Sequence, residues 1–140
     1  MTERYVELHC ASAFSFLEGA SQPEGLIERA AELGMAAVGL MDRNGVYGSA
    51  RFHTSAKRHG VHAHVGAEIA VSSFGERLRP AAWLPHQFPA EPARVSLLCE
   101  SQVGYRNLCQ MITRFKMRES LKCEGVATAE DLQAYSAGLV

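Results

Sequence analysis

Three side chains of the kinds that bind metal ions stand close to where strands are expected to end. His9 follows one short apolar run, Asp42 follows a second, and Glu68 lies late in a third. In parallel α/β folds, the carboxyl ends of the strands gather at one edge of the sheet. Two carboxylates and a histidine at such an edge are suitable ligands for a divalent metal ion that catalyses phosphate-ester chemistry. The simpler alternative is that each polar residue only begins a loop.

A second pair of candidate metal ligands is His62 and His64, which are two residues apart in the third apolar run. Side chains at alternate positions of a strand share one face, so this pair also shares its face with Glu68. A new metal site of the His-x-His type with Glu68 is therefore conceivable. We favour the alternative, in which both histidines lie near a barrel mouth or a partner surface.

The composition is that of an ordinary soluble domain. The 140 residues are 47% hydrophobic and 21% charged, and the net charge is −1. Because positive and negative charges nearly cancel, the chain has no overall positive potential that would attract duplex nucleic acid. No leader segment opens the chain, and no apolar run is long enough to cross a membrane. The four cysteines form no CxxC pair, which argues against a zinc ribbon or a disulfide framework and favours a reduced, cytoplasmic protein.

Strand and helix signals alternate over the first half of the chain. Ser21 and Glu24 form a capping box at the start of a helix, with Pro23 in its first turn. Gly34 and Gly60 fit the left-handed positions that follow helices. The expected elements are a strand over 5–8, a helix from 22 to 33, a strand over 35–41, a helix over 47–59 and a strand over 61–71. This order predicts right-handed βαβ units in a parallel sheet or barrel.

The second half of the chain begins with a segment rich in proline. Four of the five prolines fall within 72–93, which predicts a long surface excursion. A strand over 94–100, a helix over 101–119 and a helix that starts at Thr128, with Asp131 at its third position, are expected to follow. The final residues, GLV, look like the first residues of another strand, which suggests a fragment boundary.

Three stretches carry a resemblance to a known family. LHCASAFSFLEGAS, MDRNGVYG and VGAE, in this order and spacing, resemble the N-terminal PHP (polymerase and histidinol phosphatase) domain of bacterial DNA polymerase III alpha subunits. The later stretch GYRNLCQMITRFKMR is more similar to the error-prone branch than to the main replicative one. The resemblance implies that residues 1–140 are the N-terminal part of a PHP-type (β/α)7 barrel, an α/β fold with parallel strands, and that the polymerase domains lie outside this chain.

The resemblance also assigns family positions to particular residues. Four positions keep a residue of ligand type: His9, Glu18, Asp42 and Glu68. Two positions do not, because Ala11 replaces the second histidine of the first motif and Arg43 replaces the histidine of the second. The family's remaining ligands would lie beyond Val140.

These two replacements change the chemistry that we expect. Alanine offers no donor to a metal, and arginine stays protonated and has no lone pair to give. The guanidinium of Arg43 can instead pair with Asp42, Glu18 or Glu68. We therefore expect a vestigial metal site converted to ion pairs, with no catalytic residue and no cofactor in this chain. The resemblance places a divalent metal (Mg, Zn or Mn) in the parent polymerase or in active relatives.

The expected role is a structural scaffold in a DNA-directed DNA polymerase III alpha subunit of the error-prone, translesion and repair type. Its partners would be the remainder of the polymerase chain and, through the parent protein, DNA. The alternative function is a metal-dependent PHP phosphoesterase. A partial barrel exposes a sheet edge, so the isolated chain is expected to form a homo-oligomer. The basic run 114–122 is read as a solvated helix face, with a DNA contact as the sharper alternative.

Overall fold

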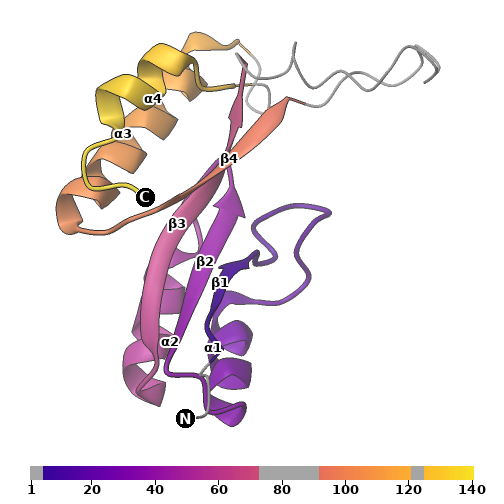
Figure 1. Ribbon diagram of the computed structural model, residues 1–140. Helices are drawn as coiled ribbons and strands as arrows, with labels where there is room; N and C mark the ends of the chain where they lie inside the picture. Colours follow the sequence, from indigo (N-terminus) through magenta and orange to yellow (C-terminus); the bar gives the residue numbers. More distant parts are fainter. Residues whose placement is uncertain (1–4, 73–91, 121–124) are drawn as a thin grey trace.

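The computed structural model of the chain describes residues 5–72, 92–120 and 125–140. The expected excursion over 72–93 therefore lies almost wholly outside the described residues. The elements are, in chain order, β1 (Glu7–Cys10), α1 (Pro23–Glu32), β2 (Ala37–Arg43), α2 (Ser49–His59), β3 (His62–Val71), β4 (Ala93–Leu98), α3 (Gln102–Arg118) and α4 (Ala129–Tyr135). Figure 1 shows that they form one twisted sheet with helices packed against it.

The strands form one sheet in the order β1-β2-β3-β4. The first three strands are parallel, as the βαβ pattern predicts. The expectation of parallel strands is wrong for β4, which runs antiparallel to β3. A parallel neighbour would require a crossover that carries the chain back to the start of β3. Ala93, where β4 begins, instead pairs with Val71, where β3 ends, so the chain returns in the opposite direction.

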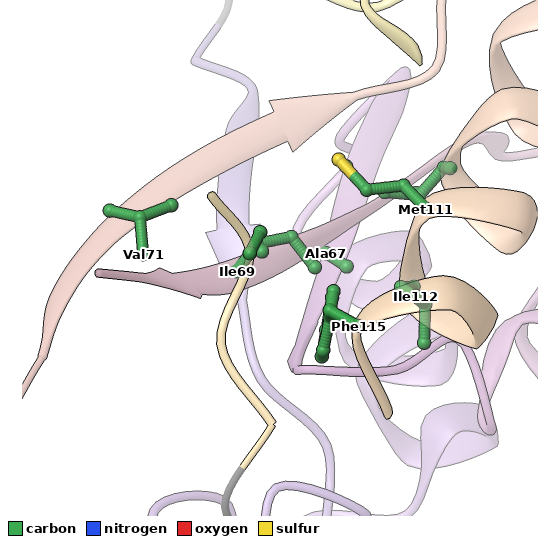
Figure 2. Packing of buried hydrophobic residues seen from close by; sticks show 8 residues of the cluster. Ala67, Ile69, Val71, Met111, Ile112 and Phe115 are labelled. Atoms are coloured by element: carbon green, nitrogen blue, oxygen red, sulfur yellow. The ribbon is translucent and has the colours of Figure 1, made fainter. Parts of the chain in front are cut away.

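Two apolar clusters hold the helices on the same face of the sheet. Near the beginning of the strands, Ile27 of α1 and Phe52 of α2 are fully buried against Leu40 of β2. Further along, Phe115 and neighbouring residues of α3 pack on Ala67, Ile69 and Val71 of β3 (Figure 2). Because the strand residues in these clusters alternate in sequence, the residues between them point to the opposite, open face. That face carries Arg43 on β2 and Glu68 on β3.

Two strands begin later than the sequence pattern suggests. β1 occupies Glu7–Cys10 rather than 5–8, and β2 occupies Ala37–Arg43 rather than 35–41. His9 and Asp42 are therefore strand residues, not the first residues of loops. The shift matters for the site, because the direction of a strand residue is decided by its register.

The expected capping box at Ser21 is wrong. The N-cap of α1 is Gln22, which makes no side-chain cap, and the helix begins at Pro23. The carbonyl of Ser21 accepts a hydrogen bond from the amide of Ala13, so Ser21 closes the preceding loop instead.

The other local signals are confirmed. Gly34 and Gly60 both have a φ of +69° and follow α1 and α2, as the left-handed positions require. Thr128 and Asp131 form a reciprocal capping box at the start of α4.

The expected last strand is represented only by a bridge between Leu139 and Cys99. Within the part of the chain that the structure describes, none of the helices has both the length and the apolar character needed to cross a membrane.

Candidate functional site

Glu18 lies in the loop 11–22, between β1 and α1, and two arginines hold its carboxylate. Arg94 binds both oxygens, with Nη2 2.9 Å from Oε1 and Nη1 2.9 Å from Oε2. Arg43 donates from Nη1 to Oε1 at 2.5 Å. A carboxylate clamped in this way by two guanidinium groups joins the loop to β2 and β4, which carry the two arginines.

Glu68 belongs to the same group of charges. In the sheet it lies between Arg43 of β2 and Ser96 of β4. Its Oε2 is 3.0 Å from Nη1 of Arg94, and its Oε1 is 3.3 Å from Nε2 of His9. We call the five residues of this group the rim cluster: His9, Glu18, Arg43, Glu68 and Arg94. Arg94 is its centre, because it bridges both carboxylates.

The rim cluster is partly shielded from water. The side chain of Arg94 is 24% exposed and that of Glu68 is 19% exposed, whereas His9 is more open. Hydrogen bonding to Arg94 lowers the pKa of Glu18, and the nearby charge of Arg43 acts in the same direction. The same contact, above all with Glu18, raises the pKa of Arg94. The ionised forms of both partners therefore stabilise each other.

Asp42 does not join the rim cluster. It precedes Arg43 on β2 and points to the helix-covered face, where it is 1% exposed. Its carboxylate accepts hydrogen bonds from the amide and hydroxyl of Ser12 and from the hydroxyl of Ser15, at 2.8–2.9 Å. Every donor comes from the loop 11–22, so Asp42 fixes that loop to the sheet.

The loop that presents Glu18 has little room to change shape. A Cβ atom at Gly19 would lie 2.1 Å from the carbonyl oxygen of Ser12, so only glycine allows this close approach. The hydroxyl of Ser15 also accepts a hydrogen bond from the amide of Arg43 at 3.0 Å. Leu17 has a positive φ of 65°, which is unusual for a residue with a side chain. Glu18 is thus held in place by the backbone on both sides.

The structure therefore divides the residues selected from the sequence into two groups. His9, Glu18, Arg43 and Glu68 lie together, Asp42 lies on the other face of β2, and Ala11 follows β1 without a polar side chain. Among residues 5–72, 92–120 and 125–140, no three His, Cys, Asp or Glu side chains are arranged so that they could hold one metal ion.

His62 and His64 lie at the start of β3, whereas Glu68 lies in its second half. Their ring centroids are 4.7 Å apart in an edge-to-face arrangement. Glu68 lies four positions further along the strand than His64, which corresponds to about 13 Å. The two histidines therefore form a group of their own and take no part in the rim cluster.

Three residues that hold the site together were not among the candidates in the sequence. Arg94 could not be identified from the sequence, because its position depends on the antiparallel register of β4, which has no local signal. Ser12 and Ser15 lie within the motif region, and a short polar side chain near a buried aspartate is the signal that could have identified them.

The chain matches a known protein family and is similar to known proteins. The family model described as "PHP domain" matches residues 7–140. The error-prone DNA polymerase of Anaeromyxobacter sp. (strain K) is 48% identical over 111 residues, which are 79% of this chain and 9% of the relative. The error-prone DNA polymerase of Bordetella bronchiseptica is 35% identical over 130 residues, which are 93% of this chain and 11% of the relative. The chain thus spans about a tenth of the length of these relatives.

Among solved structures, a protein described as a metal-dependent phosphoesterase from Bifidobacterium adolescentis superposes with a TM-score of 0.54 at 18% identity. The match covers 83% of this chain and 34% of the other. At this identity the likeness concerns the fold. It shows that the mixed sheet with alternating helices and strands corresponds to part of a larger barrel of the PHP type, which confirms the predicted fold class.

Proposed function

Since the chain belongs to the PHP domain family and is homologous to the N-terminal region of error-prone DNA polymerases, we propose that it is the structural N-terminal part of such a polymerase. In this role, residues 1–140 form a scaffold, and nucleotidyl transfer is performed by carboxylates elsewhere in a longer chain. The partners are then the remainder of the polymerase and, through it, DNA. The setting is replication and repair in the cytoplasm.

The observation that carries the scaffold role is the set of contacts of Arg94. A divalent metal needs free carboxylate or imidazole donors. Both oxygens of Glu18 and one of Glu68 are held by Arg94, and the other oxygen of Glu68 faces His9. The residues at the rim therefore do not fit a metal cluster, and their carboxylates have arginines as counter-ions.

The two replaced positions support the same conclusion. Ala11 contributes no donor, and Arg43 brings a fixed positive charge to Glu18. A cation that entered the rim would have to displace two guanidinium groups from Glu18 and would meet their repulsion. We therefore propose that His9, Glu18 and Glu68 are vestigial ligand positions that now tie the β1–α1 loop to the sheet, and that Asp42 has become an internal anchor.

The alternative function, a metal-dependent phosphoesterase, is not favoured by this chemistry. A direct test is hydrolysis of p-nitrophenyl phosphate by the purified chain in the presence of Mn²⁺. We expect no release of p-nitrophenol above that of a Glu68→Gln variant. Hydrolysis that requires Mn²⁺, stops with a chelator and is lost in Glu68→Gln would refute the scaffold role and establish the phosphoesterase.

Metal binding at the rim is tested separately by titrating Mn²⁺ into the chain. We expect the wild type and Glu18→Gln to behave alike, because Glu18 already has arginine partners. The matched control is Glu32→Gln, which removes a carboxylate from an exposed pair with Arg29 on α1. Binding that Glu18→Gln and Glu68→Gln abolish, but Glu32→Gln does not, contradicts the ion-pair assignment.

The link to a polymerase is tested at the level of the gene. On this proposal, the reading frame continues past the codon of Val140 into polymerase domains, so sequencing of the adjacent DNA decides it. A stop codon directly after Val140 would instead indicate a separate adaptor. The expected self-association of the isolated chain is measured by light scattering, where a stable monomer contradicts it.

A further inference from the structure

The first four residues of β3 carry two imidazoles that have no part in the rim cluster. His62 and His64 are two positions apart, so both side chains project from the open face of the sheet. Their rings are in edge-to-face contact, with centroids 4.7 Å apart. Two imidazoles on one face of a rigid strand, at this spacing, can reach a common ion between them.

The pair borders an open cavity that solvent and a small ion can enter. Both histidines line a cavity of about 1020 Å³, which also takes in Leu8, Leu98 and Val140. His53 of α2 lines the same cavity. The backbone beneath the pair is fixed, because the ladder with β2 runs from His62 to Glu68 without interruption. The donors are therefore held by a rigid element rather than by a loop.

One other donor that lines the cavity, the thiol of Cys99, fits a metal less well. Burial raises the pKa of this thiol to about 11, so the metal-binding thiolate is scarce at neutral pH.

We propose that His62 and His64 chelate one transition-metal cation of the Zn²⁺ type, with water in the remaining coordination positions. Imidazole suits Zn²⁺, Ni²⁺ and Cu²⁺, whereas Mg²⁺ and Ca²⁺ prefer oxygen donors. Two protein donors make the site weaker than a structural zinc site, which has four. The site is independent of the proposed polymerase role, because it uses none of the residues that the rim cluster contains.

The experiment is isothermal titration of ZnCl₂ into the 140-residue chain, with MgCl₂ as the second titrant. We expect one Zn²⁺ per chain and no heat of binding with Mg²⁺. His62→Asn and His64→Asn should each raise the dissociation constant for Zn²⁺ by about tenfold or more. This corresponds to a loss of at least ~1.4 kcal/mol of binding free energy. His53→Asn is the matched control and should leave the titration unchanged, since it removes an imidazole from the same cavity but not from the pair.

Two results overturn the proposal. One is the absence of Zn²⁺ binding by the wild type, and the other is binding that persists in a His62→Asn/His64→Asn variant. Circular dichroism establishes that each variant is folded, and the two single variants decide the question if the double variant is not. Zn²⁺ binding that instead requires Glu18 and Glu68 belongs to the rim and contradicts the ion-pair assignment there, so failures of the two proposals are distinguishable.

Discussion

Replacement of Arg94 by methionine is the sharpest test of the rim cluster. Methionine keeps a long apolar stem for packing but removes the charge and all three described hydrogen bonds, two to Glu18 and one to Glu68. Of the contacts within the described residues, Glu18 then keeps the one with Arg43, and Glu68 keeps the one with His9. Two carboxylates are left close together with less positive charge between them.

The expected loss of stability follows from the burial of these groups. Hydrogen bonds to a charged group contribute about 1.5–3 kcal/mol when buried. Exposed ion pairs contribute only about 0.2–1 kcal/mol. The side chains of Arg94, Glu18 and Glu68 are 24%, 30% and 19% exposed, between these limits. We therefore expect Arg94→Met to lower the free energy of unfolding by about 2 kcal/mol, which lowers the melting temperature by roughly 6 °C for a chain of this size.

The assay is thermal and urea unfolding followed by circular dichroism at pH 7, at low salt and in 1 M NaCl. The difference between wild type and Arg94→Met should shrink in high salt, because the Debye length falls to about 3 Å. A double-mutant cycle with Glu18→Gln isolates the pair and should give a coupling energy of about 1 kcal/mol. The matched control is Arg51→Met, which removes the more exposed pair with Glu24 and should have a smaller effect.

Equal stability of Arg94→Met and Arg51→Met, together with additivity in the cycle with Glu18→Gln, would refute the central role of Arg94. In that case Arg94 would be an ordinary surface residue, and the rim would be open to a cation. A large loss of stability that does not depend on salt or on Glu18 would assign Arg94 a packing role instead.

Three further predictions concern the buried carboxylate of Asp42, the ion pairs of Glu18 and the thiols of Cys10 and Cys99. Asp42→Ala leaves two buried hydroxyls and an amide without their acceptor, and should lower the free energy of unfolding by about 3 kcal/mol in urea unfolding; a loss below that of Arg51→Met contradicts the anchor role. Because the folded state lowers the pKa of Glu18 from 4.5, its contribution is present above pH 4.5 and is lost as the pH falls through the folded pKa, so the Glu18→Gln effect should vanish in acid, as melting curves across this range can show. Burial raises the pKa of Cys10 and of Cys99 to about 11, so alkylation by iodoacetamide should be slow at pH 7.5 and should accelerate towards pH 11 at both sites, as mass spectrometry can resolve; rapid labelling at pH 7.5 would show that these thiols are not shielded.

The order of the elements and the family are readable in the sequence because their signals are local. Gly34 and Gly60 mark helix ends through their own backbone conformation, and the capping box of Thr128 and Asp131 spans only four residues. Alternating strand and helix patterns predict three parallel strands, as the structure has them. The motif stretches identify the PHP family, which the match over residues 7–140 confirms.

The tertiary structure alone decided which of the candidate residues meet. β2 extends two residues further than its apolar pattern suggests, so Asp42 and Arg43 fall on opposite faces of the sheet. Side chains alternate with a period of two along a strand. Residue types alone therefore do not show which of two neighbours faces the rim, because this depends on the register of the strand. Asp42 consequently meets Ser12 and Ser15 rather than Glu68.

Arg94 is the clearest case of a role that the sequence could not reveal. It reaches Glu18, 76 positions away in the chain, only because β4 returns antiparallel to β3 and places it near the carboxyl ends of the parallel strands. Strand direction and register depend on hydrogen bonds between distant segments, which leave no mark on the neighbouring residues. The sequence shows which charged residues are present. Which of them form ion pairs is decided by the tertiary structure, because the sheet brings distant segments together.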